Sequence, residues 1–229
     1  MSQAEAFHIL DMRLPYAVPL LASWWWRALF AGISIGLLPL LVVLWHFTDV
    51  PLGEWMRAHW PGLFSSAHVL GAPEAWLLAS AAAYLAAAAL RERGRARWAF
   101  LFLINISAAV IVCLLLDGVA ELAQMFFARG ASAMWSHLAP SPRCATVAAA
   151  AITCWSRWPS TRWMCVTATV LVMASQITLG SFFASDALAG VWIGVLTATV
   201  IPWVWWLAHP ASMPGSQLVQ QQAFNLFEK

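Results

Sequence analysis

The chain has 229 residues, of which 62% are hydrophobic and 10% are charged, and it contains 16 Trp. Soluble domains are about 45–50% apolar and about 25% charged, so this composition excludes an ordinary soluble domain. The wealth of apolar residues excludes a disordered chain, and a net charge of +2 is too small for a nucleic-acid-binding surface. The sequence therefore predicts an integral membrane protein with no nucleic-acid partner.

Six stretches are apolar and long enough for membrane-spanning helices, which need about 20 such residues because lipid cannot satisfy an exposed backbone. They cover residues 25–47, 73–90, 98–116, 143–158, 163–179 and 186–207. We therefore expect an all-α integral membrane protein, with a six-helix membrane domain over residues 1–214 and a polar tail over 215–229. The second stretch is rich in alanine, and we expect it to pack against neighbouring helices rather than lipid.

Two connections are long enough to have structure of their own. In residues 49–72, apolar side chains recur at spacings of three and four, which predicts a short amphipathic helix on the membrane surface; they are Leu52, Trp55, Met56, Trp60 and Leu63. Residues 117–142 are expected to continue the third helix outward.

The basic residues predict the orientation. With six spans, nine of the twelve Arg and Lys fall on the side that holds both termini and three on the other, so both termini are expected in the cytoplasm. The three on the outer side are Arg57, Arg129 and Arg143. Most tryptophans fall near the predicted membrane boundaries, as interfacial indole rings do. We expect a bacterial inner-membrane protein.

Charged residues near the outer boundary mark the candidate site, because a charge at membrane depth costs about 2.5–3.5 kcal/mol on insertion scales. They are Asp117, Glu121, Arg129, Arg143 and Asp186, and we expect them to converge on one pocket. A purely structural alternative is open for two of them. In it, Asp186 caps the sixth helix and Arg143 anchors the fourth helix at the headgroups.

The sequence around Asp186 carries a family resemblance. The segment begins with Ser175 and Gln176; Phe182 follows after five residues and Asp186 after three more. This spacing is that of a motif of the type 2 phosphatidic acid phosphatases. That family's third signature reads Ser-Arg, five residues, His, three residues, Asp. The chain resembles this signature without a gap.

Two further motifs resemble the same family. The stretch 140–146, with Ser141 and Arg143, is similar to its second signature, Pro-Ser-Gly-His-Ala, and also begins a helix. Arg129 is the remnant of its first signature, which reads Lys, six residues, Arg-Pro. Six spans with a site on the non-cytoplasmic side are also what the resemblance implies.

In the family, the His of the third signature attacks phosphorus, and the Asp of that signature orients this His. The His of the second signature protonates the leaving group, and Lys and Arg side chains hold the phosphate. Here the nucleophile position is Phe182, the acid position Arg143, the arginine position Gln176 and the lysine position Leu122. Ser141, Asp186 and Arg129 persist.

We therefore expect a catalytically degenerate member of this family. It would act as an accessory or scaffold subunit or as a binder of lipid headgroups. The candidate ligand-binding residues are Arg129, His137, Ser141, Arg143 and Asp186.

The alternative is an active phosphatase on a lipid phosphate or lipid pyrophosphate, with His137 recruited as the missing imidazole. A small transporter is a weaker alternative, because the spans lack paired charges near the middle of the bilayer. The four cysteines have no ligand spacing, so neither a metal nor a cofactor is expected. The expected partners are membrane lipids and another membrane protein.

Overall fold

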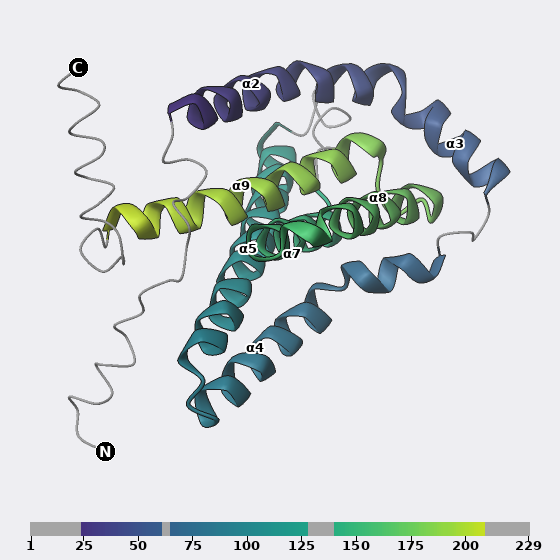
Figure 1. Ribbon diagram of the computed structural model, residues 1–229. Coiled ribbons are helices and arrows are strands. Elements are labelled where there is room, and N and C mark those ends of the chain that lie inside the picture. Colours follow the sequence, from purple (N-terminus) through teal and green to yellow (C-terminus); the bar gives the residue numbers. More distant parts are fainter. Residues whose placement is uncertain (1–23, 61–64, 128–139, 209–229) are drawn as a thin grey trace.

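The computed structural model describes residues 24–60, 65–127 and 140–208. These residues form helices joined by short connections, and no strand occurs among them (Figure 1). The elements are α2 (Trp24–Phe47), α3 (Asp49–His59), η2 (Ser65–Gly71), α4 (Pro73–Ala89), α5 (Arg93–Phe127), α7 (Pro142–Arg157), η3 (Pro159–Thr161), α8 (Arg162–Thr178) and α9 (Ala184–Ala208). The all-α fold class is thus confirmed for the described residues.

All six predicted spans correspond to helices. Most boundaries agree within two residues, but α5 begins five residues before the predicted span at 98. It also runs on to Phe127, as expected for an outward continuation of the third helix. The segment 49–72 contains the predicted short helix, α3, followed by the 3-10 helix η2. The tail 215–229 lies outside the described residues.

Helix α7 lies at the centre of the bundle. Every residue from Cys144 to Ala150 is buried, because α4, α5, α8 and α9 surround this helix. One apolar cluster joins it to α5 and α9, and a second joins it to α8 and α9. Most of its side chains are small, so the surrounding backbones come close to its axis.

The tightest contact in the bundle is between α7 and α9. A methyl group added at Gly190 would lie 3.2 Å from Cys144 Cβ and closer still to the carbonyl oxygen of Ser141. One added at Gly194 would lie 2.8 Å from Ala148 Cβ and closer to the carbonyl oxygen of Ala145. Only glycine therefore fits at these two positions, which are one helical turn apart.

A buried polar pair joins α5 to α7. Asn105 Nδ2 donates to Thr153 Oγ1 at 2.9 Å, and Thr153 Oγ1 donates to the carbonyl of Ala149 at 2.7 Å. Asn105 is fully buried. Such bonds between apolar helices specify which faces meet, since an unsatisfied amide in that environment is costly.

Helices α2 and α3 form an elbow over α9, bent by 70° between Phe30–Leu44 and Asp49–His59. The ring of Phe30 packs on that of Trp192 with centroids 5.1 Å apart, but much of the rest of α2 is exposed. In contrast, α3 places Met56 in a cluster with Ile177 and Ala184. The apolar face predicted for this segment is therefore partly used for contact with α8 and α9.

We predicted that the alanine-rich helix packs against neighbouring helices, and this was wrong for most of its surface. Helix α4 packs mainly on α5 (Figure 1), and the centroids of the Tyr84 and Phe100 rings lie 5.5 Å apart. Trp76 and Leu77 of α4 contact the apolar cluster that joins α5, α7 and α9. Most of its alanines are exposed. Bulky side chains fill the contact with the bundle, so the alanines are left on the outer side.

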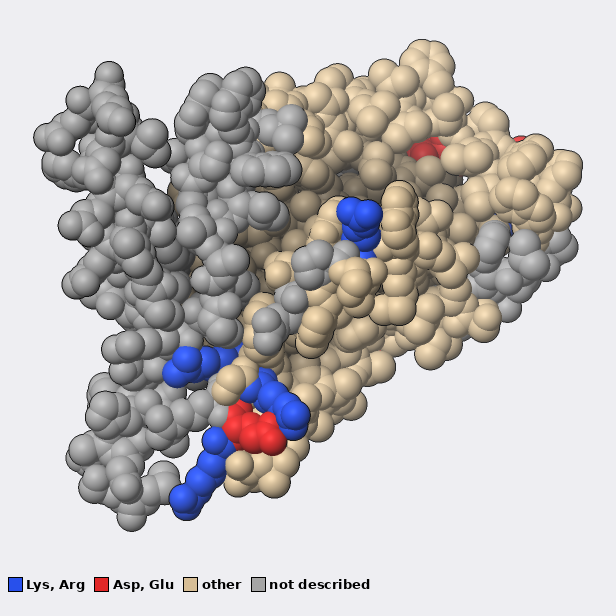
Figure 2. All heavy atoms as spheres, viewed as in Figure 1, with Lys and Arg blue, Asp and Glu red and all other residues tan. Residues whose placement is uncertain are grey.

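Among the described residues, two helices are long and apolar enough to cross a membrane, Gly94–Glu121 and Ala184–Trp205, and the bent pair of α2 and α3 would make a third. The described part of the face seen in Figure 2 is mostly uncharged, and its charged side chains gather mainly where α4 meets α5. The ion pair of Arg95 with Glu92, at 2.7 Å, joins the first turn of α5 to the preceding connection.

Candidate functional site

The structure brings Ser141 and Asp186 together. The backbone N–H of Ser141 donates to the carbonyl oxygen of Asp186 at 3.1 Å, so the first residues of α7 and α9 lie side by side. Ser141 is fully buried, and its hydroxyl caps α7 by accepting from the N–H of Cys144 at 3.4 Å. The bare backbone of Gly190 permits this approach, because any side chain there would strike Ser141.

Asp186 has a structural role at the start of α9. It is 5% exposed, and its Oδ2 accepts from the backbone N–H of Phe183 at 3.4 Å. This is the carboxylate half of a capping box, in which the side chain in the first turn reaches back to the N-cap residue. The other oxygen, Oδ1, is buried and has no hydrogen-bond partner in the described part of the chain. The capping alternative for Asp186 is thus confirmed.

A second buried carboxylate, which the sequence analysis missed, belongs to Asp49 at the start of α3. Its Oδ1 accepts from the backbone N–H of Ser185 at 3.0 Å, and its Oδ2 accepts from the Ser185 hydroxyl. Asp49 is 3% exposed. The carboxylate therefore caps α9 from another helix and ties the α2–α3 elbow to the candidate site. An acidic residue directly after a long apolar run is the signal that identifies it, since a charge there needs a partner.

The last turn of α8 and the connection to α9 carry the other two motif positions. Gln176 is 1% exposed, and its backbone carbonyl accepts from the N–H groups of Ser181 at 3.1 Å and Phe182 at 3.4 Å. Gly180 makes this turn possible with a φ of +69°, a conformation that other residues rarely adopt. Phe182 is half-buried. Gln176, Phe182 and Asp186 thus lie on one short, closely hydrogen-bonded segment.

Arg143 begins α7 and is half-buried. A methyl group added at Gly71, in η2, would lie 3.0 Å from Arg143 Cβ, so the start of α7 packs directly against η2. Arg143 makes no ion pair with any described residue.

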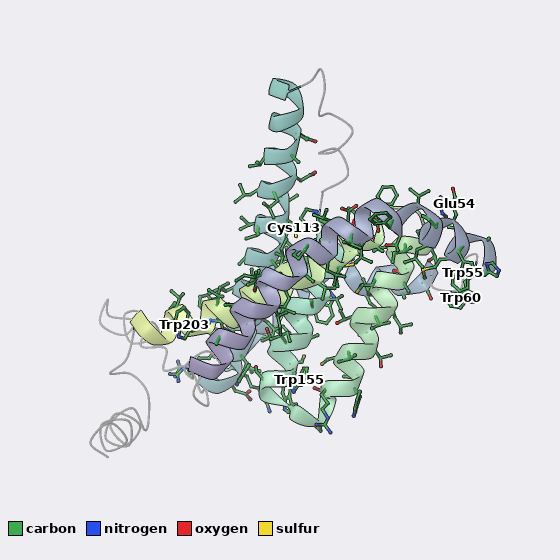
Figure 3. All side chains as sticks on the ribbon, turned by 90° about the horizontal axis from the view of Figure 1, so that it is seen from above. Glu54, Trp55, Trp60, Cys113, Trp155 and Trp203 are labelled. Atoms are coloured by element: carbon green, nitrogen blue, oxygen red, sulfur yellow. The ribbon has the colours of Figure 1, made fainter. Side chains whose placement is uncertain are left out.

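The other expected members of the pocket do not join it in the described residues. Asp117 and Glu121 are exposed on the end of α5 that projects beyond its neighbours (Figure 3). Leu122 lies in the same helix, where only its backbone is described. Arg129 and His137 lie outside the described residues.

Chemically, this cluster is rich in acceptors and poor in groups that act as nucleophiles. The described partners of Asp49 and Asp186 are backbone N–H groups and the Ser185 hydroxyl, and no described imidazole bonds to either carboxylate. Within the described residues no three His, Cys, Asp or Glu side chains gather as metal ligands. The four cysteines are free thiols.

No family model, no curated protein and no solved structure matches this chain. The resemblance to the phosphatidic acid phosphatases therefore stays a prediction that depends on the motif spacing alone.

Proposed function

We propose that this chain is a non-catalytic membrane protein of the phosphatidic acid phosphatase type, which binds a lipid headgroup or supports another membrane protein. One observation carries the proposal. The segments with the two family-like motifs meet at one end of the bundle, through the hydrogen bond of Ser141 N–H with the carbonyl of Asp186, while the motif carboxylate bonds to backbone. In this proposal, segments with the motif spacing of a phosphatase site carry side chains of a different chemistry.

The residues at the catalytic positions support the same proposal. The benzyl group of Phe182 has no lone pair with which to attack phosphorus. Arg143 stays protonated in proteins, so it does not deliver a proton to a departing alkoxide. Gln176 is neutral and buried, and it supplies no positive charge to phosphoryl oxygens.

We further propose six spans, with both termini in the cytoplasm of a bacterial inner membrane. Helices α4, α7 and α8 have 17, 16 and 17 residues. A helix of 17 residues is about 25 Å long, short of the hydrocarbon thickness of about 30 Å. Because α7 is enclosed by its neighbours, its length need not match the lipid.

The tryptophans support a chain that reaches both membrane interfaces. In Figure 3, Trp55 and Trp60 lie at one end of the molecule, well apart from Trp155 and Trp203. Trp55, Trp60 and Trp155 are exposed. Two separate groups of indole rings are typical of a protein that meets both membrane interfaces.

The proposal is tested by measuring phosphate release by the purified full chain in detergent micelles. The substrates are phosphatidic acid and an isoprenoid pyrophosphate, and the matched control is Asp186→Asn, which keeps the size of the side chain. We expect wild type and control to release phosphate at the same background rate. A wild-type turnover in the usual enzyme range of about 1–1,000 per second, lost in Asp186→Asn, would overturn the proposal.

The same assay decides the alternative of an active phosphatase. If His137 replaces the missing imidazole, wild type releases phosphate and His137→Gln does not. Equal background rates in both reject that role.

A further inference from the structure

Arg57 is a cation that the fold brings to the candidate site from a distant part of the chain. It lies in the last turn of α3, and its guanidinium extends to the turn between α8 and α9. A methyl group added at Gly180 would lie 3.5 Å from Arg57 Nη1 and 4.0 Å from Arg57 Cζ. The motif position Phe182 is two residues further along that turn.

The side chain is held in place and still has free hydrogen-bonding capacity. Arg57 Nε donates to the carbonyl of Gly53 at 3.0 Å, and a methyl group added at Gly53 would lie 3.6 Å from Nη2. The guanidinium therefore lies between two glycines, which leave space for it. Arg57 is exposed and forms no ion pair with a described residue, so its terminal N–H groups are available to a ligand.

The helix that carries Arg57 is itself firmly docked. Met56, the preceding residue, is buried against Ile177 and Ala184 on α8 and α9. Asp49, at the other end of α3, is bound to Ser185. The part of α3 that carries Arg57 is thus fixed relative to the start of α9.

Exposed aromatic side chains gather at the same end of α3 as Arg57. The ring of Trp55 stacks on His59 with centroids 4.9 Å apart and meets Trp60 edge-on at 5.1 Å. Figure 3 shows Glu54 pointing away from Trp55 and Trp60. Exposed indole rings beside an arginine are typical of a surface at the depth of lipid headgroups.

We infer that Arg57, held over the turn between α8 and α9, binds the phosphate monoester group of a ligand at this end of the bundle. A planar guanidinium offers two parallel N–H donors that match two oxygens of a phosphate group. The inference deepens the proposed function and rests on it only in placing the ligand beside the α8–α9 turn.

The test is equilibrium binding to the purified full chain in detergent micelles. The probes are dioctanoyl phosphatidic acid, glycerol 3-phosphate, and dioctanoylglycerol, which has the same acyl chains without the phosphate. The variants are Arg57→Gln, Arg57→Lys and, as the matched control, Arg95→Gln, which removes an exposed arginine from the first turn of α5.

We expect Arg57→Gln to weaken binding of dioctanoyl phosphatidic acid about tenfold, Arg57→Lys to weaken it less, and Arg95→Gln to leave it unchanged. Dioctanoylglycerol should bind more weakly than the phosphate-bearing lipid. If glycerol 3-phosphate binds as tightly as the lipid and also depends on Arg57, the inference holds and the ligand is a soluble phosphate ester. If only the lipid depends on Arg57, the ligand is a lipid headgroup.

Equal binding of the lipid to wild type and Arg57→Gln would overturn the inference, and so would equal binding of dioctanoylglycerol and dioctanoyl phosphatidic acid. Phosphate release is measured in the same samples. Release by wild type would contradict the proposed function but not the role of Arg57, so the two failures are distinguishable.

Discussion

The bundle contains two glycine pairs with the same four-residue spacing and opposite surroundings. Gly190 and Gly194 on α9 lie against the backbone of α7, where an added methyl group would strike it. Gly32 and Gly36 on α2 have nothing within 4 Å of the place where a methyl group would stand. Glycine spacing alone therefore does not tell where two helices meet.

The two glycine pairs differ because the helices that face them differ. Helix α7 offers small side chains to α9, among them Ala145 and Ala148, so the two backbones approach closely. Helix α2 contacts α9 through the ring of Phe30, and the elbow that follows α2 is tied to α9 through Asp49 of α3. The first pair positions the candidate site, because Gly190 touches Ser141.

The largest effect is expected from Gly194→Ala. The new methyl group would lie 2.8 Å from Ala148 Cβ and 2.9 Å from Ala149 N, in the most enclosed part of the bundle. We expect the free energy of unfolding to fall by about 3 kcal/mol, because overpacking a filled contact forces the helices apart. Titration with sodium dodecyl sulfate, followed by circular dichroism, measures it, and a loss below about 1 kcal/mol would contradict the close contact.

Asp49→Ala is expected to come next, since it leaves the N–H and hydroxyl of Ser185 buried without their acceptor. The expected loss in the same titration is about 2 kcal/mol. Glu54→Ala, an exposed position on the same helix, is the control and should change little. Equal stability of the two variants would show that the elbow is not tied to α9.

A smaller effect is expected at the polar pair between α5 and α7. Asn105→Ala and Thr153→Ala, combined in a double-mutant cycle, should give a coupling energy of about 0.6 kcal/mol, the average for hydrogen bonds between membrane helices. A coupling energy of zero would mean that the bond does not contribute to the contact.

The smallest effect is expected from Gly36→Ala, the counterpart of the first variant. Open space surrounds this position, and alanine favours a helix more than glycine does, so stability should stay within about 0.5 kcal/mol of wild type or rise slightly. A loss as large as that of Gly194→Ala would remove the distinction between the two pairs.

The helices were predictable from the sequence because long apolar runs leave the backbone few alternatives. Even the outward extension of α5 and the short helix α3 follow from local patterns. The exposed alanines of α4 do not, because the composition of a helix does not state which neighbours it meets. The central place of α7 is likewise a property of the whole bundle.

At the candidate site, motif spacing predicted that Ser141 and Asp186 belong together, and the structure places them in contact. Asp49 was overlooked although the cost of a charge beside an apolar run applies to it equally. No local pattern identifies Arg57, because Arg57 and Gly180 are far apart in the sequence. They come close only because α3 packs against α8 and α9. Arg129 and His137 stay predictions.

Whether the connection between α8 and α9 holds a nucleophile is tested most directly by trapping. The purified chain is mixed with phosphatidic acid labelled in its phosphate, quenched within one turnover, and examined for label attached to the protein. The account predicts no covalent label, because Phe182 offers no atom that attacks phosphorus. An acid-labile phosphoryl group on a histidine of the wild-type chain, absent from Asp186→Asn, would contradict it.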